Sequence, residues 1–310
     1  AYMFQMMNEA RINIGIHGVA TASAAYHASL DYAKNRPQGR APGAKVDSPQ
    51  VPIIEHVDVK RMLLRQKSIV EGGLLLVLQT ARYCDLAQHA DTAEERGRAQ
   101  LLLDLLTPIA KSFPAEKGFE ANALAVQVHG GYGYTSEYLP EAWLRDQKLN
   151  SIHEGTTGIQ SLDLLGRKVI KTEGVSIAAL GEEIRATCAR AERAGVPVAT
   201  REVVARAFEE VSALSAELGQ LAARDPEAAT RHSVDYLDLM STLVVSWMWL
   251  EQVAAVYERR AERPLDAGFF EGKLCAADYF LKTELPRIAH LASLCRTGED
   301  SYARMRPEWF

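Results

Sequence analysis

The stretch IIEHVDVKRMLLRQKSIVEGGLLLVLQTARYCDLA, from Ile53 to Ala87, decides the fold class, because its apolar residues recur every three to four positions. This spacing predicts one long helix over residues 53–89. The side chains expected to face inward are those of Ile54, Val57, Met62, Ile69 and Leu76. A helix of this length exceeds the usual range, so we expect it to dock onto other subunits or a further domain.

The segments around this helix show the same periodicity, and alternating strand patterns are nearly absent. Helices are predicted over residues 2–35, 93–111 and 115–129, the last of them beginning beside Pro114. Residues 36–52 hold four prolines and are predicted to form a loop. These elements, with a further helix that begins near residues 154–158, predict an antiparallel four-helix core.

The helical pattern breaks near residues 171–174 and then resumes. We therefore expect an all-α fold of two domains, a four-helix bundle in residues 1–171 and an additional helical domain in residues 175–310. The helices expected in the second domain lie near residues 176–194, 199–224, 227–262 and 267–296, the last one kinked at Pro286.

Composition excludes several classes of protein. Of the 310 residues, 47% are hydrophobic and 24% charged, and the formal net charge is −5, which argues against a nucleic-acid partner. Apolar windows such as Leu243–Leu250 are far shorter than the roughly 20 residues of a membrane span. The four cysteines lack zinc spacing, so we expect reduced thiols, no metal site and a cytoplasmic location. Because the sequence opens inside a predicted helix without an initiator Met, we expect a fragment of a longer protein.

Two clusters allow more than one interpretation from the residues alone. Trp247 and Trp249, with the nearby Met240 and Met248, are expected to pack in the core, with an exposed partner surface as the alternative. His129 either touches a cofactor or caps a helix C-terminus.

The candidate catalytic residues follow a glycine-rich turn, GGYGY, and a short helix that is predicted to begin at Pro140. HEGTTG, residues 153–158, places a carboxylate, two hydroxyls and two glycines where a loop becomes a helix. Free backbone N–H groups at such a terminus bind phosphate or an oxyanion. The same residues also suit an ordinary helix cap.

The stretch AVQVHGGYGYTSEYLPEAWLRDQKLNSIHEGTTGIQSLDLLGRKV resembles, almost position for position, the pattern of acyl-CoA dehydrogenases. The resemblance implies that Glu154 is the base that removes the α-proton of an acyl thioester while FAD accepts a hydride from the β-carbon. It also implies that the backbone N–H of Glu154 binds the thioester carbonyl. Gln127, Gly131 and Thr156 match positions that contact the flavin nucleotide.

MNEAR, residues 7–11, is similar to the start of a long helix in that family, whose arginine lies near the base. Arg11 takes that role by resemblance. Some relatives carry their base directly before this arginine, where Ala10 stands here, and Glu9 is expected on another face. Met7, with His153 and Gly155 beside the base, is expected to border the substrate.

YAKNRPQGR, residues 32–40, is similar to the loop whose first arginine reaches the pyrophosphate of a flavin in a neighbouring subunit. Arg36 is that residue, Gln38 is a weaker candidate, and His56 matches a histidine near the adenine. Val57 and Gly158 replace residues that are polar in many members, so the adenine-side contacts are expected to differ from the family pattern.

The resemblance is greatest to a larger bacterial branch that includes 3-methylthiopropionyl-CoA dehydrogenases. It implies α,β-dehydrogenation of an acyl-CoA, a homodimer or homotetramer, and electron transfer to an electron-transfer flavoprotein. An acyl-CoA oxidase and a non-catalytic helical scaffold are the alternatives. The family's N-terminal helical domain and β-domain have no counterpart in this sequence, so we expect this chain alone to be inactive and to be isolated without FAD.

Overall fold

A computed structural model describes the backbone of residues 2–41 and 43–310, and the side chains from residue 7 onward apart from residue 42. The described residues form helices connected by turns, without a β-strand; one isolated bridge joins Pro37 to Pro52. The expected all-α fold is therefore confirmed.

Three long helices build the first part of the chain. They are α1 (Tyr2–Asn35), α2 (Val57–His89, preceded by the 3-10 turn Ile53–Glu55) and α3 (Ala93–His129). Each packs against the other two. The short α4 (Pro140–Leu149) follows, and α5 (Thr157–Leu162) runs directly into a π-helical segment, Asp163–Ile170.

The predicted C-terminal ends of the first two helices, at residues 35 and 89, agree with the structure, whereas α2 begins at Val57 rather than at residue 53. The predicted break at Pro114 is wrong. α3 continues through both Pro108 and Pro114. A proline cannot donate to the carbonyl four residues earlier, which leaves the Ala110 carbonyl without its helical partner at Pro114. Gly15 of α1 lies against this carbonyl, since a Cβ built there would be 2.2 Å from the Ala110 oxygen. The interruption is therefore accommodated at a close contact between two helices.

This contact predicts a cost for adding one methyl group. Gly15→Ala should lower the free energy of unfolding by about 1–3 kcal/mol, because the new Cβ would meet backbone rather than a movable side chain. Gly97→Ala is the matched control, since Gly97 lies in α3 with no atom within 4 Å of the added Cβ, and it should stabilise by about 0.4–1 kcal/mol. Urea unfolding measures both, and a Gly15→Ala variant as stable as wild type would contradict the contact.

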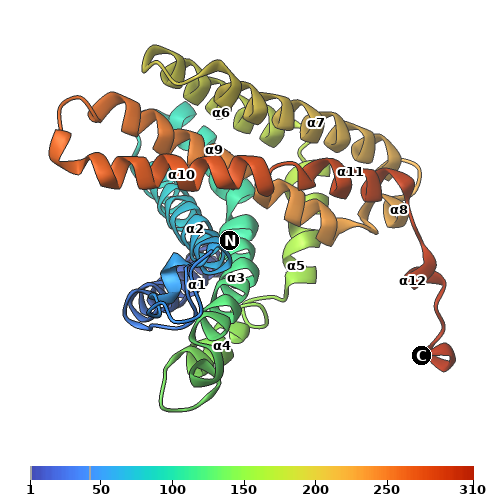
Figure 1. Cartoon of the computed structure of the whole chain (residues 1–310). Coiled ribbons are helices and arrows are strands. Elements are labelled where there is room, and N and C mark those ends of the chain that lie inside the picture. The colour runs from blue at the N-terminus through green and yellow to red at the C-terminus, as the bar shows by residue number, and fades with distance from the viewer. Residues whose placement is uncertain (1, 42) are drawn as a thin grey trace.

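The second part of the chain forms a helical layer over the first (Figure 1). Its helices are α6 (Val175–Arg193), α7 (Val198–Ala222), α8 (Pro226–Thr230), α9 (Ser233–Arg259), α10 (Ala267–Thr283), α11 (Arg287–Thr297) and α12 (Ser301–Arg304). The expected kink at Pro286 is instead a full break, with α10 ending at Thr283 and Pro286 capping α11. Glu284, in this break, pairs with Arg65 of α2, which also binds Glu120 of α3 at 2.7 Å.

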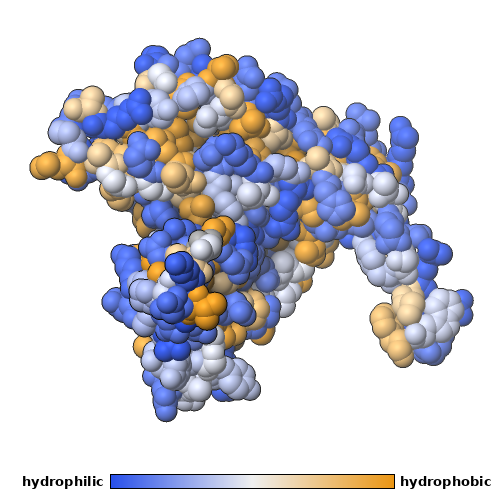
Figure 2. All heavy atoms as spheres, in the orientation of Figure 1, coloured by the Kyte–Doolittle hydropathy of each residue, from blue (hydrophilic) through white to orange (hydrophobic). Residues whose placement is uncertain are grey.

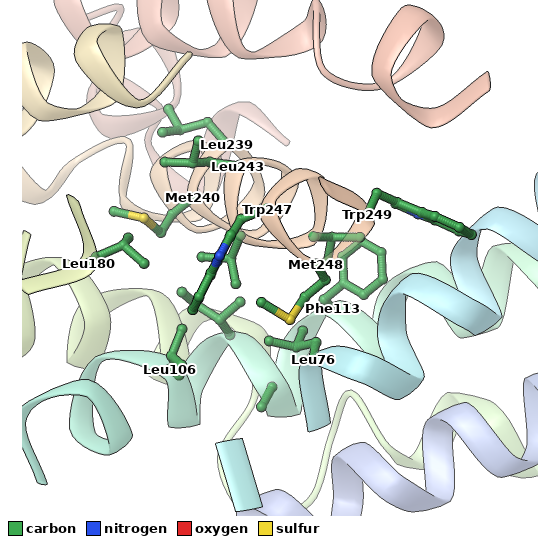
Figure 3. Packing of buried hydrophobic residues seen from close by; sticks show 14 of the residues in the cluster. Leu76, Leu106, Phe113, Leu180, Leu239, Met240, Leu243, Trp247, Met248 and Trp249 are labelled. Carbon is green, nitrogen blue, oxygen red and sulfur yellow. The ribbon is translucent and has the colours of Figure 1, made fainter. Parts of the chain in front are cut away.

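One buried hydrophobic cluster extends from α1–α3 into α6–α11, with α9 at its centre. Figure 3 shows Met248 of α9 beside Leu76 and Phe113 of the first layer, and Trp247 extending toward Leu106. Both tryptophans and both methionines of the α9 cluster are at most 2% exposed, so core packing is confirmed. The outer face in Figure 2 is mostly hydrophilic, with hydrophobic residues scattered among the polar ones.

α9 is more apolar than the segment Leu243–Leu250 alone suggests. Among the described residues it is the one helix long and apolar enough to cross a membrane, judged by length and composition. Inside the structure, 83% of its most apolar window is buried. The hydrophobicity of α9 therefore serves packing inside the protein, both against the other helices of its own layer and against α2 and α3.

The inward positions predicted for α2 are correct at Met62, Ile69 and Leu76, which are at most 6% exposed. Val57 is 76% exposed, contrary to the prediction. It is the first residue of α2, just after the 3-10 turn, and the first buried residue of this helix is Met62. Helical periodicity therefore identifies the buried stripe except at this end.

Candidate active site

Glu154 lies in the turn between α4 and α5, with its side chain exposed. Its φ of 55° places it in the left-handed region, which costs a residue with a Cβ about 1–2 kcal/mol. Gly155 follows with φ of 94°, and Thr156 caps α5 in an extended conformation. A strained glutamate persists only where its surroundings hold it.

Two buried donors hold the backbone of this turn. The Gln160 side-chain amide donates to the Glu154 carbonyl at 2.9 Å, and the Lys111 ammonium donates to the Gly155 carbonyl at 2.8 Å. Both donors belong to residues with no exposed surface. Consecutive carbonyls are therefore drawn into the protein while the Glu154 carboxylate stays at the surface.

Lys111 comes from α3 and lies beneath the turn. Burial lowers its pKa to about 8, and the positive charge of Arg11 adds to this effect, while Glu116 and Glu154 act in the opposite direction. The lysine thus remains largely protonated at neutral pH. Lys111 was not predicted as a site residue, although a lysine inside the apolar stretch LLTPIAKSF is a signal of a buried cation.

Arg11, on α1, is buried and forms an ion pair with Asp163 at 2.8 Å. Asp163 opens the π-helical segment after α5 and was also not identified from the sequence. The charges of Arg11 and Glu154 both act on the pKa of Lys111, so both side chains lie in the neighbourhood of this lysine. Met7 lies one helical turn before Arg11 and is half-buried.

Glu9 lies on another face of α1, as expected. Its side chain is exposed, and its charge contributes to raising the pKa of the Cys84 thiol on α2, after the larger effect of burial. No such effect links Glu9 to Lys111. The side chain beside the turn, His153, is partly buried, and its Nε2 atom has no hydrogen-bond partner among the described residues.

A second group of candidate residues meets where α1 and α3 end. The Arg36 guanidinium lies over the Tyr132 ring of the glycine-rich turn, 5.9 Å from its centre. Gln127 and Gly131 are exposed on the same end of α3 and the turn after it. The sequence motifs around residues 36 and 131 therefore come together in the fold.

Gln38 and His56 belong to the same loop region. The His56 Nε2 atom is 2.7 Å from the Gln38 carbonyl, so this histidine braces the loop against the start of α2. His129 stacks on Tyr32 with ring centres 4.4 Å apart, and its Nδ1 atom is 2.8 Å from the Ala125 carbonyl. Burial lowers the pKa of His129. These contacts favour the helix-capping interpretation of His129.

The two groups lie far apart along shared helices. Lys111 and Gln127 are separated by about 24 Å of α3, and Arg11 and Arg36 by about 37 Å of α1, at 1.5 Å per residue. Thr156 belongs to the first group. The structure thus brings Glu154, Arg11, Thr156 and their neighbours to one place and Arg36, Gln38, His56, Gln127 and Gly131 to another.

Comparisons with known proteins agree with this fold. Residues 1–170 match the family model "Acyl-CoA dehydrogenase, C-terminal domain", and residues 180–306 match "Acetyl-CoA dehydrogenase C-terminal like". The crystal structure of an acyl-CoA dehydrogenase from Bacillus anthracis, complexed with FAD, superposes with a TM-score of 0.73 at 19% identity. That superposition covers 97% of this chain and 50% of the other.

Curated relatives are similar over nearly the whole chain. The 3-methylmercaptopropionyl-CoA dehydrogenase of Ruegeria pomeroyi is 39% identical over 92% of this chain and 48% of its own length. The broad-specificity linear acyl-CoA dehydrogenase FadE5 of Mycobacterium tuberculosis is 32% identical over 96% of this chain and 50% of its own length. The chain therefore spans about half the length of these relatives and belongs to the acyl-CoA dehydrogenase family, as a C-terminal portion of it.

Proposed function

We propose that the whole protein is an FAD-dependent dehydrogenase that converts an acyl-CoA thioester into the trans-2-enoyl-CoA, with Glu154 as its base. The observation that carries this proposal is the turn at Glu154. An exposed carboxylate in a left-handed conformation, fixed from below by two buried donors, suits a general base that must stay in position.

In this proposal the Glu154 carboxylate accepts the α-proton of the thioester. The inward direction of the Glu154 and Gly155 carbonyls leaves the backbone N–H of Glu154 free to donate to the thioester carbonyl, which stabilises enolate charge and acidifies the α-carbon. Arg11 adds positive charge nearby, and Met7 and His153 border the acyl group. FAD, when bound, accepts the hydride from the β-carbon.

The second group of residues fits the anionic nucleotide end of FAD. Arg36 forms no ion pair with any residue that the structure describes, and its Nε atom is buried without a partner. A guanidinium without an anionic partner suits a diphosphate, to which it presents paired donors. No atom lies within 4 Å of a Cβ built at Gly131, so a ligand can approach the backbone there.

The distance between the two groups supports an assembly of subunits. Because the two groups lie about 24 Å apart along α3, we propose that they serve different flavins, and that Arg36, Gln38, His56, Gln127 and Gly131 serve the flavin of a neighbouring subunit. Thr156 would serve the flavin beside Glu154. We accordingly propose a homodimer or homotetramer, with a division between residues 1–171 and 175–310 within each chain.

The remaining proposals concern partners and location. We propose that electrons pass to an electron-transfer flavoprotein, and that the protein is cytoplasmic without membrane or nucleic-acid partners. These rest on the family and on the formal net charge of −5.

An activity assay tests the proposed function. The whole protein, incubated with acyl-CoAs of different chain length, should reduce a dye acceptor and form the enoyl-CoA without consuming oxygen. Oxygen consumption with peroxide formation would identify an oxidase instead. Failure to oxidise any acyl-CoA, with flavin bound, would contradict the proposal.

A further inference from the structure

The turn that carries Glu154 is held by a buried cation, Lys111, to which the proposed reaction assigns no role. Lys111 is wholly buried, and its one hydrogen bond among the described residues goes to the neutral carbonyl of Gly155. Among the residues that the structure describes, no carboxylate lies within ion-pair distance of Lys111. Burying a cation without a paired anion is costly, so stability alone does not account for this lysine.

The geometry links Lys111 directly to the conformation of Glu154. Lys111 fixes the carbonyl of Gly155, and Gln160 fixes the carbonyl of Glu154 and approaches that of Gly155 at 3.4 Å. The Glu154 carbonyl belongs to the peptide that joins the two residues of positive φ, and the Gly155 carbonyl belongs to the next peptide along the chain. Without the donors, Glu154 would be free to relax toward the right-handed region that its Cβ favours.

We propose that Lys111 is a positioning residue, which holds the Gly155 carbonyl, and with it the turn directly after Glu154, so that the Glu154 carboxylate and backbone N–H face the substrate together. The inference rests on the proposed function, because it assigns Lys111 a purpose only if Glu154 is the base. Lys111 lies on α3, outside the turn that carries Glu154, and its proposed role requires no contact between Lys111 and the substrate.

Kinetics of the whole protein test the proposal with four variants. Lys111→Met removes the donor and keeps the length of the side chain, and Gln160→Leu removes the other donor. Lys117→Met is the matched control, since Lys117 lies on the same helix but pairs with Asp238 of α9 at 3.2 Å. Glu154→Gln reports on the proposed function itself.

Lys111→Met should lower kcat roughly 10- to 100-fold, the order expected when a reacting group is displaced. Its KM should change by less than about threefold, because the nucleotide end of the substrate does not depend on this turn. Lys117→Met should keep kcat within about threefold of wild type. The melting temperature of Lys111→Met should not fall below that of wild type, since a buried cation has been removed. A lysine with a merely structural role would give the opposite, a lower melting temperature with an unchanged kcat per folded molecule.

A crystal structure of the 310-residue chain with Lys111→Met gives a second measurement that is independent of activity. We expect Glu154 to leave the left-handed region or the turn to lose order. If Lys111→Met does not fold, the kcat of Gln160→Leu tests the same support and should fall at least about tenfold. Glu154 retained at positive φ, or a kcat of Lys111→Met within threefold of wild type, would overturn the inference. Turnover by Glu154→Gln would overturn the proposed function, whatever the turn does in the crystal.

Discussion

Replacing Glu154 with glutamine in the whole protein should lower turnover of the acyl-CoA substrate at least about 10²-fold. The amide is nearly isosteric with the carboxylate and retains the backbone N–H, but it cannot accept the α-proton at neutral pH. Flavin content should change little, because the residues proposed to bind the flavin nucleotide, among them Arg36, lie far from Glu154. Acyl-CoA affinity should also change little, because Lys111 and Gln160 still hold the backbone of the turn. Steady-state kinetics and equilibrium binding measure the two effects separately.

Glu9→Gln is the matched control for this prediction. Glu9 is an exposed glutamate near Cys84, on a different face of α1 from Arg11. This variant should retain the turnover of wild type within about threefold. Near-normal turnover by Glu154→Gln together with a large loss in Glu9→Gln would transfer the role of base to Glu9.

Replacing Trp249 with alanine should lower the free energy of unfolding by about 3–5 kcal/mol, the cost of emptying a buried aromatic site. Trp249 has no exposed surface, and its indole N–H donates to the Ser68 carbonyl of α2 at 3.2 Å. The indole fits against α2 because Gly72 has no side chain: a Cβ built at Gly72 would be only 2.8 Å from the indole nitrogen of Trp249. The substitution therefore creates a cavity between the two helical layers and removes the indole hydrogen bond to the Ser68 carbonyl.

Trp309→Ala is the control for this substitution. Trp309 is 56% exposed, so its removal should change stability by less than about 0.5 kcal/mol. Denaturant unfolding of both variants measures the difference. Equal stability of the two variants would show that the contact between α9 and α2 contributes little, and that the two layers are stabilised elsewhere.

Local patterns predict much of this fold because helices are local structures. The spacing of apolar residues identifies α1, α2, α6 and α7 within a few residues, and it assigns the α9 tryptophans to the core. It merges α8 with α9 and α10 with α11, because each pair shares one apolar pattern across a short break. The errors occur where a distant contact decides. Pro114 breaks an isolated helix, but here the Ala110 carbonyl that it leaves free meets Gly15 of another helix. At Pro286 the predicted kink becomes a break, because Glu284 turns toward Arg65 of α2.

The candidate site divides in the same way. Glu154, Arg11 and Arg36 are predicted by their motifs, since the resemblance assigns each a role. Lys111 and Asp163 are not, because each acquires its importance from a partner far away in the sequence, 44 residues for Lys111 and 152 for Asp163. A buried cation is recognised only when the burial and the partner are both known.

Release of deuterium from an acyl-CoA deuterated at its α-carbon is the most direct test of Glu154 as the base, because it follows the hydrogen that Glu154 is proposed to accept. The whole protein should transfer α-deuterium to water at least as fast as it forms the enoyl product, as measured by mass spectrometry of the recovered thioester. Glu154→Gln should release deuterium at least about 10²-fold more slowly while still binding the thioester. Release by Glu154→Gln at the rate of wild type would contradict the account, since another group would then remove the proton.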